Sequence, residues 1–354
     1  MKRLLLALLF IFIVCLVATP TYASDAYQYK MTTDSKEWAS MDHQQKLDVT
    51  QISEKELKDM DTDTLLAVVL DYPLMGDIFC FNSLEEGVEV VRSSFGGLDE
   101  FLNREDMGST IIKQYKSQKT GIKKMFLDAL LSSSSVFKNL TDDQQKEIAN
   151  SIVESIERGE DTPFVDKNSE VAAAVIRATL VPETNLSITS AQESPLATKV
   201  INAYVVTPRG SRVAALIRGE ELSPSQVTNL NNQVGAQYKT AVRLRNATTN
   251  YNCHSYALYS VSAANIYWIS APSHYFTDGS FTHIGSYPTA VNQRLYYPAP
   301  GSEHTAIINA FGPGNVINSS VKCTSKWGMA GLYSHSAIDC PYFTSVYIYK
   351  VYRP

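Results

Sequence analysis

The sequence predicts an α+β protein, with a helical N-terminal part followed by a C-terminal part in which a helix packs on several antiparallel strands. Three observations predict this class. From about residue 45 to 160, apolar residues recur at helical spacing behind helix-capping signals. From about residue 200, short strand-like runs alternate with turn residues. From residue 247, tyrosines become frequent between Gly, Pro and Ser.

The first 23 residues have the pattern of a secretory signal peptide. Lys2 and Arg3 precede an apolar run from Leu4 to Val17, and Thr21-Tyr22-Ala23 is typical of a cleavage site. The run is shorter than the ~20 residues that a membrane-spanning helix needs. We therefore expect a soluble, secreted mature chain that does not act at the membrane. An uncleaved membrane anchor is the alternative.

Charge and composition limit the classes of partner that the chain is expected to bind. Without Lys2 and Arg3 the chain keeps 29 basic and 36 acidic side chains, a formal net charge of −7. This mild acidity argues against nucleic acid and anionic membranes as principal partners. The length suggests about two domains. The sequence predicts no cofactor, and it leaves the oligomeric state open.

Residues 24–165 are predicted to form a helical domain, and residues 166–198 a polar linker. Capping-box patterns begin helices at Ser53, Ser83 and Thr141. His43 is the only histidine before His254, so this region contains no catalytic constellation. The sequence assigns no function to it.

Residues 199–245 predict a β-hairpin followed by a helix. Val200–Val206 and Arg212–Ile217 alternate like strands around the turn Thr207-Pro208-Arg209-Gly210. Ser223-Pro224-Ser225-Gln226 combines an N-cap, a proline at the first helical position and a capping-box glutamine, which predicts a helix to about Tyr238. The strands expected in the last domain, residues 246–354, are Arg294–Tyr297, His304–Ala310, Val321–Trp327 and Ser345–Arg353.

Cys253 is the candidate nucleophile. Asn252 is a strong N-cap residue, so Cys253 is expected in the first turn of a helix. The helix dipole there favours a thiolate and a depressed pKa, and the free amides, with the Asn252 side chain, are suitable oxyanion donors. His254 points elsewhere on the helix, as a structural or substrate-facing residue. The alternative for Cys253 is a small buried hydrophobe.

His304 is the candidate base. With period two, His304, Ala306 and Ile308 share one face of a strand, which we expect to pack on the helix of Cys253. A thiol nucleophile needs such a base within hydrogen-bond distance, held by a third group. Ser325 is the candidate for that group, because a hairpin from His304 would return there; Thr324 and Asn309 are alternatives.

The remaining cysteines suggest a bridge, not a metal centre. Cys323 and Cys340 are the expected disulfide pair of an exported chain, worth about 3 kcal/mol in the loop-entropy model. A zinc site built from Cys253 and the histidines is conceivable, but no compact ligand spacing supports it, so no metal is predicted.

The run Tyr251 to Ala257, the later His304 and the run Ser325-Lys326-Trp327-Gly328 resemble the papain-like fold of bacterial NlpC-type and CHAP-type cysteine amidases and endopeptidases. The resemblance covers residues 246–354. The whole chain also resembles secreted bacterial proteins that join a helical N-terminal region to this motif.

The resemblance implies roles for individual residues. Cys253 would be the nucleophile, His304 the general base and Ser325 the orienting residue. Asn252, His254 and Trp327 would belong to the oxyanion or substrate site. The sequence departs from the family at His254, where Ser or Thr is usual, and at Ser325, where His, Asn or Gln is usual.

The function predicted on this basis is a secreted thiol amidase or endopeptidase that acts through an acyl-enzyme on a peptide, with cell-wall peptides as the implied substrate. Two alternatives stay open: a non-catalytic secreted binding protein with a degenerate site, and an acyltransferase using the same thiol. The helical region would be an inhibitory pro-region, a wall-binding module or a scaffold.

Overall fold

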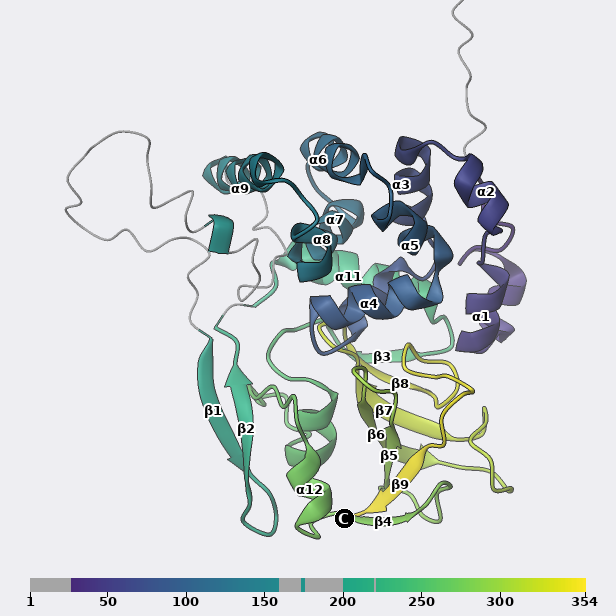
Figure 1. The fold of residues 1–354 in the computed structure, drawn as a ribbon. Helices are drawn as coiled ribbons and strands as arrows, with labels where there is room; N and C mark the ends of the chain where they lie inside the picture. The colour runs from purple at the N-terminus through teal and green to yellow at the C-terminus, as the bar shows by residue number, and fades with distance from the viewer. Residues whose placement is uncertain (1–26, 159–172, 176–199, 220) are drawn as a thin grey trace, which may run out of the picture.

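The computed structural model describes residues 27–158, 173–175, 200–219 and 221–354. The predicted signal peptide and most of the predicted linker lie outside the described residues. The α+β class is confirmed: Figure 1 shows helices in the upper part of the molecule and an antiparallel sheet below them. Within the described ranges, no helix combines the length and the apolar character needed to cross a membrane.

The N-terminal part consists of short helices. They are η1 (Lys36–Ser40), α1 (His43–Val49), α2 (Glu54–Asp59), α3 (Thr62–Leu70), η2 (Met75–Cys80), α4 (Leu84–Ser94), α5 (Gly96–Leu102), α6 (Met107–Ser117), α7 (Ile122–Ser132), α8 (Ser134–Phe137) and α9 (Asp142–Glu157). The capping boxes predicted at Ser53 and Thr141 are confirmed. At Ser83 only half of the box forms: its hydroxyl accepts from the Glu86 amide, but no bond from the Glu86 carboxylate back to the Ser83 amide is seen.

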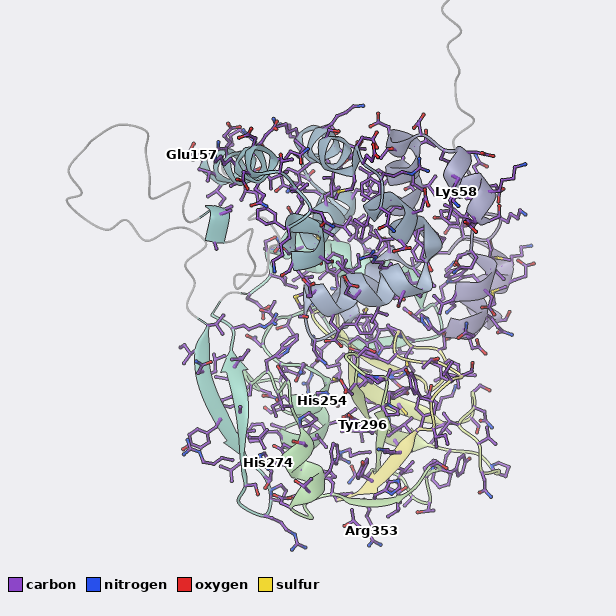
Figure 2. The ribbon with its side chains drawn as sticks, in the orientation of Figure 1. Lys58, Glu157, His254, His274, Tyr296 and Arg353 are labelled. Atoms are coloured by element: carbon purple, nitrogen blue, oxygen red, sulfur yellow. The ribbon has the colours of Figure 1, made fainter. Side chains whose placement is uncertain are left out.

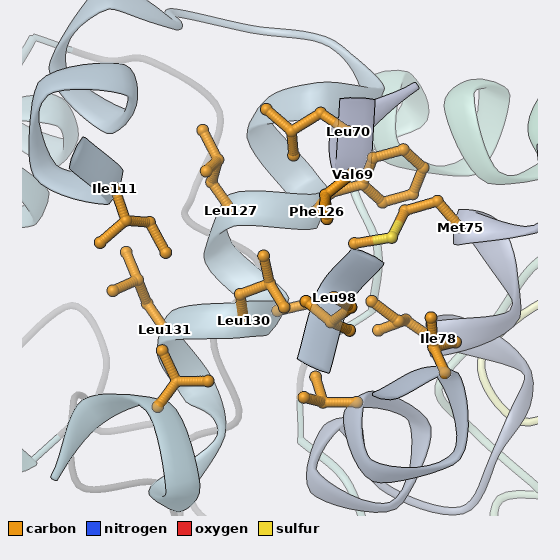
Figure 3. Packing of buried hydrophobic residues seen from close by; sticks show 14 of the residues in the cluster. Val69, Leu70, Met75, Ile78, Leu98, Ile111, Phe126, Leu127, Leu130 and Leu131 are labelled. Carbon is orange, nitrogen blue, oxygen red and sulfur yellow. The ribbon is translucent and has the colours of Figure 1, made fainter. Parts of the chain in front are cut away.

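These helices enclose one apolar core. Figure 3 shows Val69 and Leu70 of α3, Ile78 of η2, and Phe126 and Leu130 of α7 converging there. Their side chains are almost entirely buried. Each large apolar side chain contributes about 1.5–3 kcal/mol when it leaves water, so the core explains why helices this short are stable.

The hairpin and the helix predicted for residues 199–245 are confirmed. β1 (Ile201–Val206) pairs antiparallel with β2 (Arg212–Ile217), and the turn between them closes with Gly210 at φ 90°. Helix α11 (Pro224–Gln237) begins with a complete capping box. It lies among the N-terminal helices (Figure 1), with Leu230 in the helical core and Val234 in the core of the sheet.

The C-terminal part is a seven-stranded antiparallel sheet in the order β3-β8-β7-β6-β5-β9-β4. The strands are β3 (Val242–Arg245), β4 (Thr282–Gly285), β5 (Arg294–Tyr297), β6 (His304–Ala310), β7 (Lys322–Lys326), β8 (Leu332–Ser336) and β9 (Lys350–Arg353). β5 and β6 have the predicted bounds, whereas the last strand is shorter than predicted. β3, β4 and β8 were not predicted. Because β3 pairs with β8, hydrogen bonds cross the boundary predicted at residue 245.

Both faces of the sheet are covered. Ala306 and Ile308 of β6 belong to a core shared with Phe81 and α11. Ile307, between them, faces a second core with Ala257 and Leu258. Neighbouring side chains of a strand point to opposite faces, so β6 separates the two cores.

The segment that follows η2 inserts into the C-terminal part. The Met329 amide donates to the Phe79 carbonyl over 2.9 Å, and the Tyr342 hydroxyl donates to the Cys80 carbonyl. Near the N-terminus, Trp38 Nε1 donates to the Gln237 carbonyl over 2.7 Å. These contacts join the helical part and the sheet through backbone groups.

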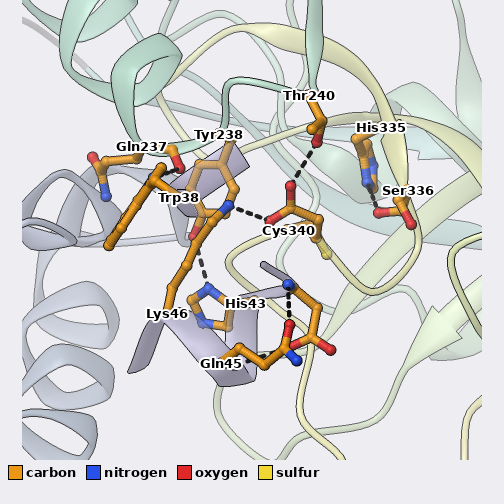
Figure 4. Close-up of polar contacts among 12 residues, drawn as sticks. Trp38, His43, Gln45, Lys46, Gln237, Tyr238, Thr240, His335, Ser336 and Cys340 are labelled. Atoms are coloured by element: carbon orange, nitrogen blue, oxygen red, sulfur yellow. Dashed lines mark hydrogen bonds and ion pairs between the residues drawn. The ribbon is translucent and has the colours of Figure 1, made fainter. Parts of the chain in front are cut away.

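A buried polar network completes the junction (Figure 4). Lys46 Nζ lies 2.6 Å from Asp339 Oδ1 and 4.8 Å from the centre of the Tyr238 ring. The Tyr238 hydroxyl donates to Asp77 over 2.9 Å, so His43 Nδ1, 3.0 Å away, must be the donor to the tyrosine oxygen. Burial lowers the pKa of His43 to about 3, which keeps this imidazole neutral. The two parts therefore form one folded unit.

Candidate functional site

The start of the Cys253 helix agrees with the sequence prediction. Asn252 Oδ1 accepts from the Ser255 amide over 3.1 Å, and the Asn252 carbonyl accepts from the Tyr256 amide over 2.9 Å. Asn252 is thus the N-cap, and Cys253 occupies the first turn. The turn continues as a π-helix, η3 (Ser255–Tyr259), in which the Ser260 amide donates to the Ser255 carbonyl. Such short π segments are frequent at functional sites.

The Asn252 side chain has all its hydrogen-bonding groups engaged. Its Nδ2 donates to Asn82 Oδ1 over 2.9 Å and to the Ile269 carbonyl over 2.7 Å, while its Oδ1 accepts from the Ser255 and Ile269 amides. The residue is fully buried. Asn252 therefore holds the helix start against a segment of the helical part, and it has no free donor for an oxyanion.

The Cys253 thiol is buried, with no exposed surface. The thiol donates a hydrogen bond to Asn82 Oδ1, 3.9 Å from the sulfur. Burial raises the pKa of the Cys253 thiol to about 12, and the backbone amides of Thr305 and His254, which favour the thiolate, only partly offset it. The predicted depression of this pKa is wrong, because desolvation outweighs the helix terminus.

His304 makes no hydrogen bond with Cys253. Thr305, the next residue, faces that helix: its hydroxyl lies 2.8 Å from His254 Nδ1. The His304 ring instead stacks on Tyr342, with centroids 3.7 Å apart, and meets Tyr297 edge-on. Among the described residues, neither of its ring nitrogens has a hydrogen-bond partner. Burial lowers the pKa of His304 well below the usual range, so the imidazole stays neutral.

Ser325 and Trp327 belong to a different cluster. Ser325 Oγ lies 2.7 Å from Nε2 of His335 and accepts from Trp327 Nε1 over 3.0 Å. Trp327 is fully buried and stacks on Tyr333. The partner of Ser325 is therefore His335 of β8, a strand that the sequence did not predict, and no hydrogen bond links Ser325 to His304 in the structure.

His254 is a structural residue in this arrangement. It is buried, contacts Thr305 through Nδ1 and lies beside Tyr296 of β5 (Figure 2). Burial lowers its pKa to about 4. The structure thus brings Cys253, His254 and Thr305 together, but it does not join Cys253, His304 and Ser325 by hydrogen bonds.

The predicted disulfide is not formed. Cys323 and Cys340 are both free, buried thiols. Each adjoins the Tyr297 hydroxyl, and Cys340 Sγ also lies 3.6 Å from the Ala337 carbonyl. The two thiols thus have polar neighbours other than each other.

In the described part of the chain, no group of three or more His, Cys, Asp and Glu side chains could hold a metal ion.

Tyr342 and Glu86 line a groove on the protein. Its volume is about 700 Å³. It is formed by α1, α4 and the loops at 299–302 and 341–347, so both parts of the protein contribute to it. Two residues of its wall, Tyr342 and Glu86, interact electrostatically with Cys253, which does not itself line the groove. The sequence reasoning missed this groove. No local pattern indicated it, because its walls come from segments far apart in the sequence.

Comparison with family models, with curated proteins and with solved structures finds no match to this chain.

Proposed function

We propose that this chain is a secreted, non-catalytic ligand-binding protein. In this proposal residues 246–354 keep a papain-like arrangement of helix and antiparallel strands. The residues at the catalytic positions of a thiol hydrolase are buried there as part of the structural core. The signal-peptide pattern of residues 1–23 supports secretion. The groove between the two parts is the binding site, because mixed concave sites of 300–1,000 Å³ are typical of ligand sites.

One observation carries the proposal: the environment of Cys253. The thiol has no exposed surface, a pKa raised to about 12 and a hydrogen bond to an amide oxygen, while the His304 nitrogens make no hydrogen bond to it. A nucleophilic cysteine needs a thiolate and access to substrate. A pKa of about 12 leaves roughly 10⁻⁵ of the thiol ionised at pH 7.

Thiol reactivity tests the proposal directly. In native protein, iodoacetamide at pH 6 and pH 8 should modify Cys253 at least ~100-fold more slowly than a free thiol such as glutathione, because burial and the raised pKa both suppress the thiolate. Mass spectrometry of the digested protein locates the label. Cys80, also fully buried and with a raised pKa, is the internal control.

One labelling result would contradict the proposed binding function. Labelling of Cys253 at pH 6 faster than glutathione would sink the proposal and restore the thiol amidase or acyltransferase prediction. Partition of a trapped acyl-enzyme between water and added amine would then separate those two activities.

A further inference from the structure

The walls of the groove combine aromatic and acidic side chains. Aromatic rings come from Tyr72, Phe81, Tyr342, Phe343 and Tyr347. Carboxylates come from Asp48 of α1, from Asp77, and from Glu86 and Glu89 of α4. Asp77 is buried and close to Lys46, so its charge is partly balanced. The acidic character of the open groove therefore rests on Asp48, Glu86 and Glu89.

Positive charge is missing from these walls. Among the described residues that line the groove, there is no lysine or arginine, and the single histidine, His43, is neutral because burial lowers its pKa to about 3. The hydrogen-bond donors seen for two of the acids are uncharged. Asp48 accepts from Gln44 Nε2 over 3.0 Å, and Glu89 accepts from Ser135 Oγ over 2.7 Å.

Glu86 provides an independent sign of a ligand. Its Oε1 is buried and has no hydrogen-bond partner among the described residues. A buried carboxylate oxygen without a donor is costly, and such groups call for an explanation. A donor supplied by a bound ligand would satisfy it, and Glu86 belongs to the groove wall.

Exposed apolar side chains adjoin one residue of the groove, Tyr347. Tyr347 lines the groove, and its neighbours Val346 and Ile348 are the most exposed large hydrophobic residues of the described chain, at 77% and 78%. Exposed apolar side chains beside a concave site mark an interaction surface. A ligand that carries a cation on an apolar stem matches both the acidic interior and these apolar side chains.

We propose that the groove binds an ammonium or guanidinium group carried on an apolar chain, with Glu86 and Glu89 as the acceptors and Tyr342 as an aromatic wall. The inference rests on the proposed binding function and specifies its ligand class. The cation has two plausible sources, a free diamine or the side chain of a basic peptide residue, and both present the same chemistry.

Calorimetric titration of the full chain with matched probes tests the inference. The cationic probes are 1,5-diaminopentane and Nα-acetyl-lysine methylamide, and the neutral probe is the Nε-acetylated form of the latter. We expect both cationic probes to bind at least roughly tenfold more tightly than the neutral one, and more weakly as salt rises. The tighter of the two identifies the source of the cation.

Two variants and a control locate the site. At pH 9, above the raised pKa of Glu86, Glu86→Gln and Glu89→Gln should each weaken cation binding by roughly fivefold or more, because each removes one carboxylate. Glu157→Gln on α9, at the opposite end of the helical part in Figure 2, should leave affinity unchanged. Thermal unfolding checks that all three variants fold.

The pH dependence gives a second readout. Burial raises the pKa of Glu86 to about 8, with Glu303 adding to the shift and an Asn82 backbone amide opposing it. The other groups around it are Tyr342, Cys253 and, on its own helix, Glu85 and Glu89, with Asp77 (pKa about 7) also in the wall. Glu86 and Asp77 lose their protons and gain negative charge as pH rises through this range, so cation affinity should increase from pH 6 to pH 9. Glu86→Gln should remove most of that increase.

The outcomes separate the two proposals. If the neutral probe binds as tightly as the cations, or if Glu86→Gln and Glu89→Gln bind like wild type, the cation inference is overturned while a binding function survives. Failure of both cationic probes to bind overturns it as well. A fast-reacting Cys253 overturns the proposed function instead, and that assay uses no cation.

Discussion

The variant Gly328→Ala should lose about 4 kcal/mol or more of unfolding free energy. Gly328 has φ 41°, and a Cβ built on it would lie 2.2 Å from the Phe81 carbonyl oxygen and 2.4 Å from the Cys80 carbonyl carbon. These are backbone atoms of the segment that inserts from the helical part, so no rotamer change relieves the clash. Overpacking and a strained φ are both among the mechanisms that give large losses.

The surrounding contacts prevent the turn from moving aside. The buried Lys326 Nζ donates to the Gly328 and Ala330 carbonyls over 2.6 Å each, and the Met329 amide donates to the Phe79 carbonyl. Urea unfolding followed by tryptophan fluorescence measures the loss. Gly235→Ala on α11, where a Cβ meets nothing within 4 Å, is the matched control. It should be neutral or stabilising by about 0.5–1 kcal/mol. A Gly328→Ala variant as stable as wild type would mean that this junction is loose.

The second large effect is expected for Lys46→Ala, at about 3–5 kcal/mol of lost stability. Lys46 and Asp339 are both buried and lie 2.6 Å apart. Among the described residues, Thr240 is the one side-chain donor that Asp339 keeps once the ammonium is gone. Removal of one member leaves the other as an uncompensated buried charge, which is the main part of the loss.

Chemical unfolding of a small variant set checks this. The double variant Lys46→Met with Asp339→Asn should recover much of the stability, because the pair is then replaced by groups without net charge. Lys58→Ala, which breaks the exposed pair with Glu54, should change stability little. Equal, small effects of Lys46→Ala and Lys58→Ala would contradict the view that the two parts fold as one.

Both predictions bear on the role of the helical part. An inhibitory pro-region has to leave, but removal of η2 and its following segment would uncover the core shared by Phe81, Val234 and Ala306. It would also break the ion pair of Lys46 with Asp339. Among the three interpretations of this region, the structure favours a scaffold, and one that supplies most of the residues lining the groove.

The signals that worked from sequence were local ones. The capping boxes at Ser53, Thr141 and Ser223, the turn at Gly210 and the N-cap at Asn252 all appear as predicted. These depend on residues within four positions of one another, so a short run of sequence contains the whole interaction. β5 and β6 were also predicted with the bounds that the structure gives them.

The failures were of another kind. β8 was missed although it carries His335, the partner of Ser325. The faces of β6 were assigned to the wrong neighbours, since a period of two separates alternate residues but does not say which element covers each set. His304 therefore packs on Tyr342, and Thr305 is the residue that meets the Cys253 helix.

The sequence alone determined the class of fold, the start of the Cys253 helix and the strand that carries His304. Only the tertiary structure decided the chemical state of the thiol, because desolvation depends on what covers a group. Here Asn82 and Glu86, some 170 residues earlier in the chain, help to close the site. A helix terminus that favours a thiolate can be read from five residues, but the burial that raises the pKa to about 12 comes from the whole fold.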